Sequence, residues 1–270
     1  YIGAADDPYT CYVGQSTLVG AVARLMQPGC KLDTAPIFIG KQGDGKSTAI
    51  KVLFGEEYTT DQLAAFGSKD ASMQLLNFWA IEWAEIDNLN KSESNEAKAF
   101  VARQFEDFRP PYGRKVIRRG RQCIFIGTTN EEVFLKDQTG NRRYYPVKIG
   151  GNIDLEALSR DREQLWAEAF HLYQAGVKWW ADRSFERKHV QAQQELVTVE
   201  DAWTPLIAEY LKKQMFDVGN QEFTVGGILE HALGLSKDRW GTIENRRVTA
   251  ILQTLGFSRG KRTSEKRVWV

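Results

Sequence analysis

The fold is decided by the stretch Ile37-Phe38-Ile39-Gly40-Lys41-Gln42-Gly43-Asp44-Gly45-Lys46-Ser47-Thr48. It begins as a short apolar strand, continues as a glycine-rich turn and ends as the start of a helix. Gly40, Gly45, Lys46 and Ser47 fit the spacing G-x-x-x-x-G-K-S/T of a phosphate-binding loop. A chance glycine turn after a strand is the alternative, but the helical run that continues to Phe54 favours the loop.

The loop pattern requires these residue types for physical reasons. Glycines allow the backbone to wrap so that successive N–H groups point at phosphate oxygens, and the helix start adds its positive end. Lys46 can reach the β and γ phosphates, and the Ser47 hydroxyl can ligate Mg²⁺. The stretch alone therefore predicts a bound nucleoside triphosphate. The predicted nucleotide-binding residues are Gly40, Gln42, Gly43, Asp44, Gly45, Lys46, Ser47 and Thr48.

The composition excludes few functions. The chain has 270 residues, of which 42% are hydrophobic and 26% charged, as in an ordinary globular protein of one or two domains. Its net charge of +1 gives no overall sign of nucleic-acid binding, so any such sign must come from local clusters. Three scattered cysteines exclude a disulfide framework and, without a C-x-x-C pair, disfavour a zinc site.

Targeting signals are missing from the sequence. No stretch is long and apolar enough to cross a membrane, and no signal peptide opens the chain. We therefore expect a cytoplasmic protein without a membrane partner. The sequence begins at Tyr1 rather than at a methionine, which indicates a fragment of a longer protein.

Two acidic residues follow the next apolar stretch. Leu75 to Glu82 reads as a turn leading into a buried strand that ends in a carboxylate, and Glu85 comes shortly after. In phosphate-loop NTPases one acid at the end of a neighbouring strand holds Mg²⁺, and a second polarises the attacking water. We expect Glu82 in the metal role with Ser47, and Glu85 in the polarising role. The alternative is an exposed acidic helix start, since Asp87 to Glu96 is polar.

A basic segment of six cations runs from Arg109 to Arg121, and no acidic residue follows before Glu131. Prolines exclude a helix at its start, and its glycines suggest a hairpin or a tight loop. A basic hairpin suits a nucleic-acid backbone, because cations meet phosphates and an aromatic tip can stack on a base. A solvated basic loop, or a few arginines that pair with Glu and Asp residues elsewhere, is an equal alternative. The predicted DNA contacts are Tyr112, Arg114, Lys115, Arg118 and Arg119.

Two further segments add polar residues to the predicted site. The apolar strand Cys123 to Asn130 ends in polar residues, and many ring ATPases place a sensor of the γ-phosphate at such an end, so Asn130 is the candidate. A plain strand-to-loop turn would end in the same way. The next turn presents Arg142 and Arg143, and a projecting arginine can stabilise charge on the transferred phosphoryl group. We favour Arg143 over Arg142 as this finger; an ion pair beside the following strand is the alternative.

A polar linker divides the chain into residues 1–198 and 199–270. The second part is typical of a winged helix, with three helical patterns followed by a hairpin pattern. These patterns cover residues 203–215, 225–233, 242–255 and 257–270. Over the last 34 residues nine basic side chains outnumber three acidic ones, a net charge of +6 that indicates DNA binding. Arg246 and Arg247 are expected to face outward toward DNA.

The elements stand in a fixed order: strand–loop–helix, acidic strand, basic hairpin, Thr-Thr-Asn strand and Gly-Asn-Arg-Arg turn. That order resembles the virulence-associated protein E family, whose ATPase domain is similar to the superfamily 3 helicases of phages and small DNA viruses. The resemblance covers residues 1 to about 150. It is carried by Pro28 to Lys31, Gly40 to Thr48, Glu82 to Glu85, Arg109 to Arg114, Cys123 to Asn130 and Thr139 to Arg143.

The resemblance implies an AAA+-like fold, usually a hexameric ring, that hydrolyses ATP to move along single-stranded DNA. It implies that Arg143 acts in trans on the site of a neighbouring subunit. It also implies a replication protein of a phage, prophage or mobile island in a bacterial cell, often with a primase domain N-terminal to this piece. The chain departs from superfamily 3 in one respect: the two acids are not adjacent, because Trp83 follows Glu82 and the second acid is Glu85.

We therefore expect an α/β fold: a phosphate-loop NTPase of the AAA+, superfamily 3 helicase-like type with a helical lead-in, followed by a small winged helix. The expected activity is ATP-dependent unwinding, with ATP and Mg²⁺ as cofactors, single-stranded and forked DNA as partners, and a homo-oligomeric ring. A nucleotide-switched, DNA-binding replication initiator without unwinding activity is the first alternative. A phosphate-loop kinase of a small molecule is the second, against which the basic hairpin and the paired arginines argue.

Overall fold

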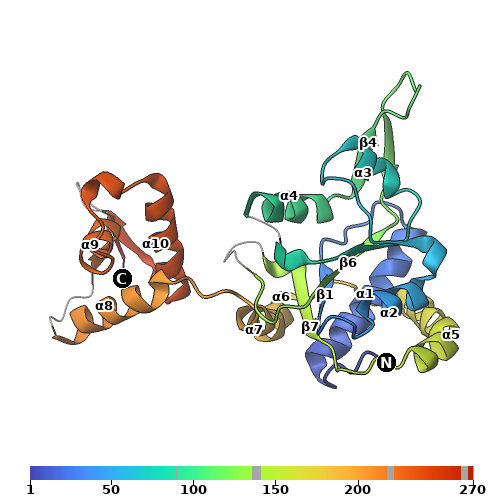
Figure 1. Ribbon diagram of the computed structural model, residues 1–270, viewed down its shortest axis with the longest axis horizontal. Helices are drawn as coiled ribbons and strands as arrows, with labels where there is room; N and C mark the ends of the chain where they lie inside the picture. Colours follow the sequence, from blue (N-terminus) through green and yellow to red (C-terminus); the bar gives the residue numbers. More distant parts are fainter. Residues whose placement is uncertain (89–90, 136–140, 218–221, 263–266, 270) are drawn as a thin grey trace. The chain divides into compact units, whose positions relative to one another are not determined.

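A computed structural model (Figure 1) describes residues 1–88, 91–135, 141–217, 222–262 and 267–269. The chain divides into two compact units, Tyr1–Val199 and Glu200–Val270. The expected turn at Thr139-Gly140 and part of the expected terminal hairpin lie outside the described residues.

The first unit is built on a five-stranded parallel sheet, which confirms the expected α/β class. The strands lie in the order β2 (Thr59–Thr60), β3 (Ala80–Trp83), β6 (Ile124–Thr129), β1 (Ala35–Ile39) and β7 (Tyr144–Lys148). The three central strands are almost entirely buried, which explains their continuous apolar sequences. The edge strand β7 contains Pro146, which has no N–H to donate and is tolerated only at such an edge.

Helices cover both faces of this sheet (Figure 1). One face carries α1 (Pro8–Met26), α2 (Lys46–Phe54) and α5 (Leu155–Gln174). The opposite face carries α3 (Lys69–Gln74) and α4 (Lys91–Val101). Successive residues of β6 show the division, because Ile124 and Ile126 pack in the core of the first group and Phe125 in the core of the second.

Short helical segments complete the first unit. They are η1 (Glu56–Tyr58), η2 (Ile86–Asn88), η3 (Asn141–Arg143), α6 (Arg183–Phe185), the π-helical η4 (Glu186–Val190) and α7 (Gln191–Leu196). The two long helices begin at acidic caps: Asp7 accepts a hydrogen bond from the Thr10 N–H, and Asp154 from the Ala157 N–H. Among the described residues, no helix combines the length and apolar composition needed to cross a bilayer.

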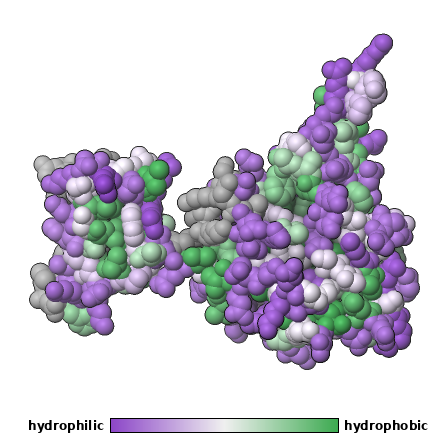
Figure 2. Space-filling view, in the orientation of Figure 1, coloured by the Kyte–Doolittle hydropathy of each residue, from purple (hydrophilic) through white to green (hydrophobic). Residues whose placement is uncertain are grey.

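A β-hairpin projects from the first unit between α4 and β6 (Figure 1). Its strands β4 (Phe105–Phe108) and β5 (Ile117–Gly120) pair antiparallel, with Glu106 opposite Arg119 and Asp107 opposite Arg118. Hydrophilic residues cover most of its surface (Figure 2). The basic segment therefore forms the hairpin expected for it.

The second unit combines helices with a small antiparallel sheet. Its described helices are α8 (Trp203–Asp217), α9 (Val225–His231), η5 (Lys237–Arg239) and α10 (Thr242–Thr254). Its described strands lie in the order β8 (Phe223–Thr224), β10 (Arg267–Trp269) and β9 (Arg259–Arg262). The core gathers around Leu229, Val248 and Trp269. The sequence predicted the three long helical segments and missed β8, because two residues are too few to show an alternating pattern.

Candidate nucleotide and DNA site

The glycine-rich turn lies between the carboxyl end of β1 and the first turn of α2. Gly43 and Gly45 have φ angles of 88° and 86°, in the left-handed region that glycine adopts without strain. Gly40 has no room for a side chain, since a Cβ there would lie 2.6 Å from Cγ1 of Ile149. The glycines are therefore required by the shape of the turn itself.

The remaining predicted loop residues lie on the outside of the turn. The Asp44 carboxylate accepts a hydrogen bond from the Lys41 N–H at 2.7 Å, which closes the turn. Gln42 and Thr48 are exposed. These two side chains face solvent at the carboxyl edge of the sheet, the side from which ligands enter open parallel sheets.

The Lys46 side chain folds under the turn. Its Nζ donates to the carbonyl oxygens of Gly40 at 2.6 Å and Lys41 at 2.8 Å, and to Oδ1 of Asn130 at 3.0 Å. Burial lowers the pKa of this ammonium, and the carboxylates of Asp44 and Glu82 oppose the shift. The structure thus brings Lys46 and Asn130 together, although 84 positions separate them in the sequence.

Ser47 and Glu82 meet beside the same turn. The Ser47 hydroxyl donates to Oε1 of Glu82 at 2.6 Å, and the Thr128 hydroxyl donates to the same oxygen at 3.0 Å. Glu82 is 2% exposed, and its Oε2 has no hydrogen-bond partner among the described residues. A buried carboxylate oxygen without a partner is costly unless a cation meets it. Sequence reasoning missed Thr128; the polar end of its strand was the signal, but it was assigned to Asn130.

Ser47 and Glu82 fit a magnesium ion. Mg²⁺ prefers oxygen ligands, and nucleotide sites hold it with one or two protein oxygens together with phosphates. The Ser47 hydroxyl and the unpartnered Oε2 of Glu82 offer such oxygens on adjacent elements. The described residues contain no group of three or more His, Cys, Asp or Glu side chains able to hold a metal. The protein ligands found here would therefore need phosphate or water oxygens to complete the shell.

Glu85 lies in the turn after β3, away from these contacts. Its φ is 52°, which is uncommon for a residue with a Cβ, and its Oε2 accepts a hydrogen bond from Nδ2 of Asn88 at 2.8 Å. Asp87 accepts a hydrogen bond from the Thr129 hydroxyl at 2.5 Å and so joins this turn to the end of β6. Glu82 and Glu85 therefore occupy different settings, one buried and one exposed.

Arg142 and Arg143 lie at the opposite end of the sheet. They belong to the η3 turn that enters β7, where Tyr144 pairs with Ala35 at the start of β1. The glycine-rich turn follows Ile39 at the end of β1, four residue steps or about 13 Å further along the strand. Nε of Arg143 is buried, and no other residue that the structure describes forms a hydrogen bond with it. Within one subunit the structure does not bring Arg143 to the glycine-rich turn.

Both arginines line a cavity of about 500 Å³. Lys31, Trp179 and Trp180 line it as well, and the Trp179 indole N–H donates to the Lys31 carbonyl at 2.9 Å. Trp180 is 51% exposed. This end of the sheet therefore presents cations together with aromatic rings.

Tyr112 stands at the tip of the β4–β5 hairpin, with a fully exposed side chain and a φ of 60°. Two contacts close the tip: the Gly113 N–H donates to the Pro110 carbonyl at 3.0 Å, and Nε of Arg109 donates to the Gly113 carbonyl at 2.6 Å. A strained residue held by such contacts supports a hypothesis of function. The exposed ring is placed where it can meet a ligand without rearrangement.

The predicted DNA-contacting cations of the hairpin are all exposed. These are Arg114, Lys115, Arg118 and Arg119. Arg118 also has partners on the hairpin itself, since its guanidinium lies 4.5 Å from the centroid of the Phe105 ring and 3.9 Å from Asp107. Arg121, the last cation of the basic segment, is 2% exposed and therefore adds nothing to the basic surface.

The two predicted DNA-contacting residues of α10 differ. Arg246 is exposed. Arg247 donates from Nε and Nη2 to the Asp201 carboxylate at 2.7 and 2.8 Å, and its guanidinium lies 3.9 Å from the centroid of the Trp203 ring. The structure thus gives Arg247 a partner elsewhere in the second unit, which the spacing of residues within α10 could not indicate.

One family description matches most of the chain. It is the virulence-associated protein E-like domain, over residues 1–198, which confirms the resemblance and extends it beyond the motifs. No curated protein matches the chain. Two solved structures of the NrS-1 C terminal region (305-718) are similar to it: an apo structure with 16% identity and a TM-score of 0.47, and an A form apo structure with 14% identity and a TM-score of 0.44. Both matches cover 100% of this chain, and 77% and 76% of the respective structures.

Proposed function

Because the chain belongs to the virulence-associated protein E-like domain family, we propose that it is the ATP-dependent DNA helicase part of a phage or mobile-element replication protein. One observation carries the proposal: Lys46, Ser47, Glu82 and Asn130 converge on a single glycine-rich turn between a buried strand and a helix. That convergence supports hydrolysis of a nucleoside triphosphate. The first unit is then a phosphate-loop NTPase of the AAA+, superfamily 3 type.

Each residue has a defined task in this proposal. The turn Gly40–Thr48 binds the triphosphate of ATP, and Lys46 exchanges its carbonyl and Asn130 partners for phosphate oxygens. Asn130, released from Lys46, then contacts the γ-phosphate. Ser47 and Glu82 would hold Mg²⁺, which would supply positive charge beside the phosphates. Glu85, exposed at the carboxyl edge of the sheet, orients the attacking water.

The position of Arg143 supports a site shared between subunits. Its separation from the glycine-rich turn argues against a contact with the γ-phosphate of the same subunit, and its Nε has no hydrogen-bond partner among the described residues. An arginine supplied in trans is an established way of stabilising charge in phosphoryl transfer. We therefore assign Arg143, with Arg142 beside it, to the neighbouring site in a homo-oligomeric, hexameric ring.

DNA contacts are proposed at two places. In the first unit, Arg114, Lys115 and Arg119 meet phosphates of a single strand, and Tyr112 stacks on a base. In the second unit, the element order α8-β8-α9-α10-β9-β10 and the antiparallel sheet support a winged helix. The proposed DNA contact of this unit is Arg246, because its side chain is exposed and takes no part in the Arg247–Asp201 pair.

The test compares Lys46→Ala with Lys51→Ala, a cation on the same helix further from the turn. ATP hydrolysis and unwinding of a forked DNA are measured with Mg²⁺ present. Lys46→Ala should abolish both activities, and Lys51→Ala should retain both. If Lys46→Ala hydrolyses ATP at the wild-type rate, the assignment of the nucleotide site is refuted. If the wild-type chain hydrolyses no ATP, the proposed enzymatic activity is refuted.

The alternative of a nucleotide-switched initiator is favoured by one observation, the winged-helix element order of the second unit together with the net charge of +6 over its last 34 residues. Such a protein recognises an origin duplex and uses ATP only to control assembly. The same fork assay separates the two functions, because an initiator protects a specific duplex in footprinting and leaves the fork paired.

A further inference from the structure

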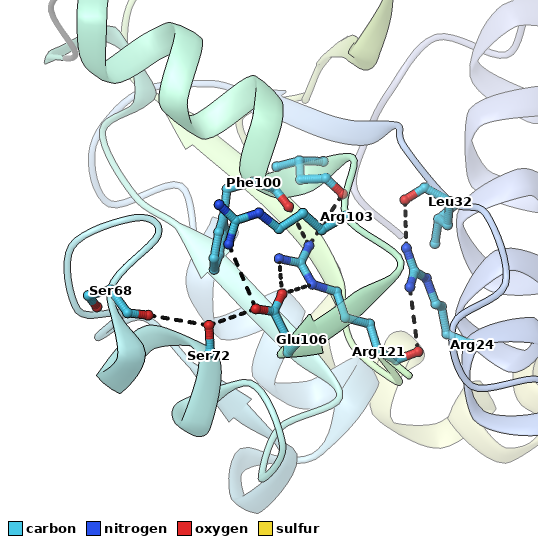
Figure 3. A network of polar contacts seen from close by, with 9 residues as sticks. Arg24, Leu32, Ser68, Ser72, Phe100, Arg103, Glu106 and Arg121 are labelled. Carbon is cyan, nitrogen blue, oxygen red and sulfur yellow. Dashed lines mark hydrogen bonds and ion pairs between the residues drawn. The ribbon is translucent and has the colours of Figure 1, made fainter. Parts of the chain in front are cut away.

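The charge of Arg121 is neutralised inside the protein rather than on the hairpin surface (Figure 3). Arg121 directly follows β5, and its Nε donates to Oε1 of Glu106 at 2.6 Å. Its Nη2 forms an ion pair with the same oxygen, and both residues are 2% exposed. Since Glu106 lies on β4, the pair closes the base of the hairpin.

The same guanidinium caps the end of α4. Its Nη1 donates to the carbonyl of Phe100 at 2.5 Å, one of the terminal carbonyls that a helix cannot satisfy internally. The guanidinium carbon lies 4.4 Å from the ring centroid of Phe100 and 5.3 Å from that of Phe125 on β6. Glu106 also accepts a hydrogen bond from the Ser72 hydroxyl of α3 at 2.6 Å. Two buried side chains thus join the hairpin to α3, α4 and β6.

The backbone of Arg121 is anchored on the end of α1. The Gly29 N–H donates to the Arg121 carbonyl at 2.9 Å, and Nη1 of Arg24 donates to the same oxygen at 3.5 Å. At Gly120 a Cβ would lie 2.6 Å from the Pro28 carbonyl oxygen, so the backbone segments around Gly120 and Pro28 are in close contact. The base of the hairpin is therefore fixed on two sides, while its tip is exposed.

The other end of α4 lies on the side of the η2 turn, which is bonded to the end of β6. Its first residue, Lys91, follows the η2 turn, in which Asp87 accepts the hydrogen bond from Thr129 at the end of β6. α4 has 11 residues and is about 16 Å long. One helix therefore extends from the segment after the η2 turn to the Arg121 guanidinium.

We propose that Arg121, through Glu106, is a positioning residue that fixes the β4–β5 hairpin to the carboxyl end of α4, so that the hairpin moves with α4 when the nucleotide changes. The inference rests on the proposed function. A buried ion pair resists separation, because each charge would lose its closest counter-ion at a position that solvent barely reaches. An apolar contact is non-directional and would permit sliding. The buried cation of the basic segment thus couples the hairpin to the site, and the exposed ones contact DNA.

The main experiment compares Glu106→Gln with Asp107→Asn in the full chain. Asp107 is the matched control, because it is the next residue on β4 and its contact with Arg118 is exposed. Glu106→Gln should keep the basal ATPase rate and lose the stimulation of that rate by single-stranded DNA, whereas Asp107→Asn should keep both. Wild-type stimulation in a folded Glu106→Gln variant would overturn the proposal.

Hydrogen exchange supplies a readout that does not depend on catalysis. Without nucleotide, peptides covering residues 105–120 should exchange faster in Glu106→Gln than in Asp107→Asn, while peptides covering 35–48 should not differ. If Glu106→Gln does not fold, hydrogen exchange of the wild-type chain is measured with and without a non-hydrolysable ATP analogue. Residues 91–101 and 105–120 should then change protection together, and a change in only one of these segments would overturn the proposal. A wild-type chain without ATPase activity would instead refute the proposed function, and the nucleotide-free exchange would still decide the role of Arg121.

Discussion

Mixing two inactive variants tests whether the hydrolytic site is shared between subunits. Lys46→Ala removes the cation of the turn and keeps the arginine finger, whereas Arg143→Ala keeps the turn and removes the finger. The parallel pairing of β1 with β7 puts these residues at opposite ends of the sheet, about 13 Å apart along the strands. A subunit that carries either substitution therefore still offers one intact half-site to a neighbour.

The expected recovery follows from this geometry. Loss of an arginine finger lowers phosphoryl-transfer rates about 10³–10⁵-fold, or about 4–7 kcal/mol, so each variant alone should hydrolyse ATP near background. In a ring assembled at random from equal amounts, an interface is complete when the turn comes from an Arg143→Ala subunit and the finger from a Lys46→Ala subunit. Each condition holds for half of the subunits, so about one quarter of the wild-type activity should return, whatever the ring size.

The assay is steady-state ATP hydrolysis after the two chains are co-assembled at varied ratios. Activity should follow the product of the two fractions, with its maximum at equal amounts. The control replaces Arg143→Ala by the double variant Lys46→Ala/Arg143→Ala, which supplies no intact turn and should restore nothing. Background activity in mixtures that native mass spectrometry shows to be co-assembled would refute the placement of Arg143 in trans.

Three further predictions concern the hairpin, the core and the second unit. Replacing Arg114 and Lys115 by Gln should weaken single-stranded DNA binding and lower the slope of log K against log salt by about 0.7 per lost phosphate contact, as measured by fluorescence anisotropy; an unchanged slope would place DNA elsewhere. Burial raises the pKa of Tyr12 to about 12, so the folded state favours the neutral phenol; its stabilisation is complete below pH 10 and is lost as the pH rises toward 12. Tyr12→Phe should therefore flatten the alkaline decline of the urea midpoint, and an unchanged decline would assign it to other groups. Arg247→Ala should lower the stability of the second unit by about 0–1 kcal/mol and leave its DNA affinity unchanged. Arg246→Ala should lower the DNA affinity and leave the stability unchanged. Chemical denaturation and DNA titration of both variants measure the two quantities, and equal losses of affinity would contradict the prediction.

Local patterns predicted the features that depend on neighbouring residues in the chain. The run from Ile37 to Thr48 contains its own strand, its own turn glycines and its own helix start, so its conformation needs no information from elsewhere. Pro110 and Gly113 likewise define the tip of the hairpin by their own backbone preferences. The order of such pieces along the chain was then sufficient to indicate the family.

Features that depend on distant partners could not be predicted in this way. The basic segment includes Arg121, and its pattern leaves open that some arginines pair with acids elsewhere, but it does not indicate that Arg121 does so with Glu106, 15 positions earlier on the opposite strand. Arg247 was expected to face DNA, and the Asp201 carboxylate that binds it lies 46 positions away. Periodicity reports which residues share a face of a helix; it does not report which charge from another element meets that face.

The opposite placement of the glycine-rich turn and Arg143 also restricts how subunits can assemble. In an isologous contact the same surface of both subunits meets itself across a twofold axis, so the Arg143 end of the sheet would face another Arg143 end unless one interface covered both ends. The proposed trans role of Arg143 instead requires a heterologous contact, in which the Arg143 end of one subunit meets the turn end of the next. Such a contact closes into a ring or continues as a filament. Either assembly has a direction, because every subunit activates one neighbour and is activated by the other, and that polarity is what one-way movement along a DNA strand requires.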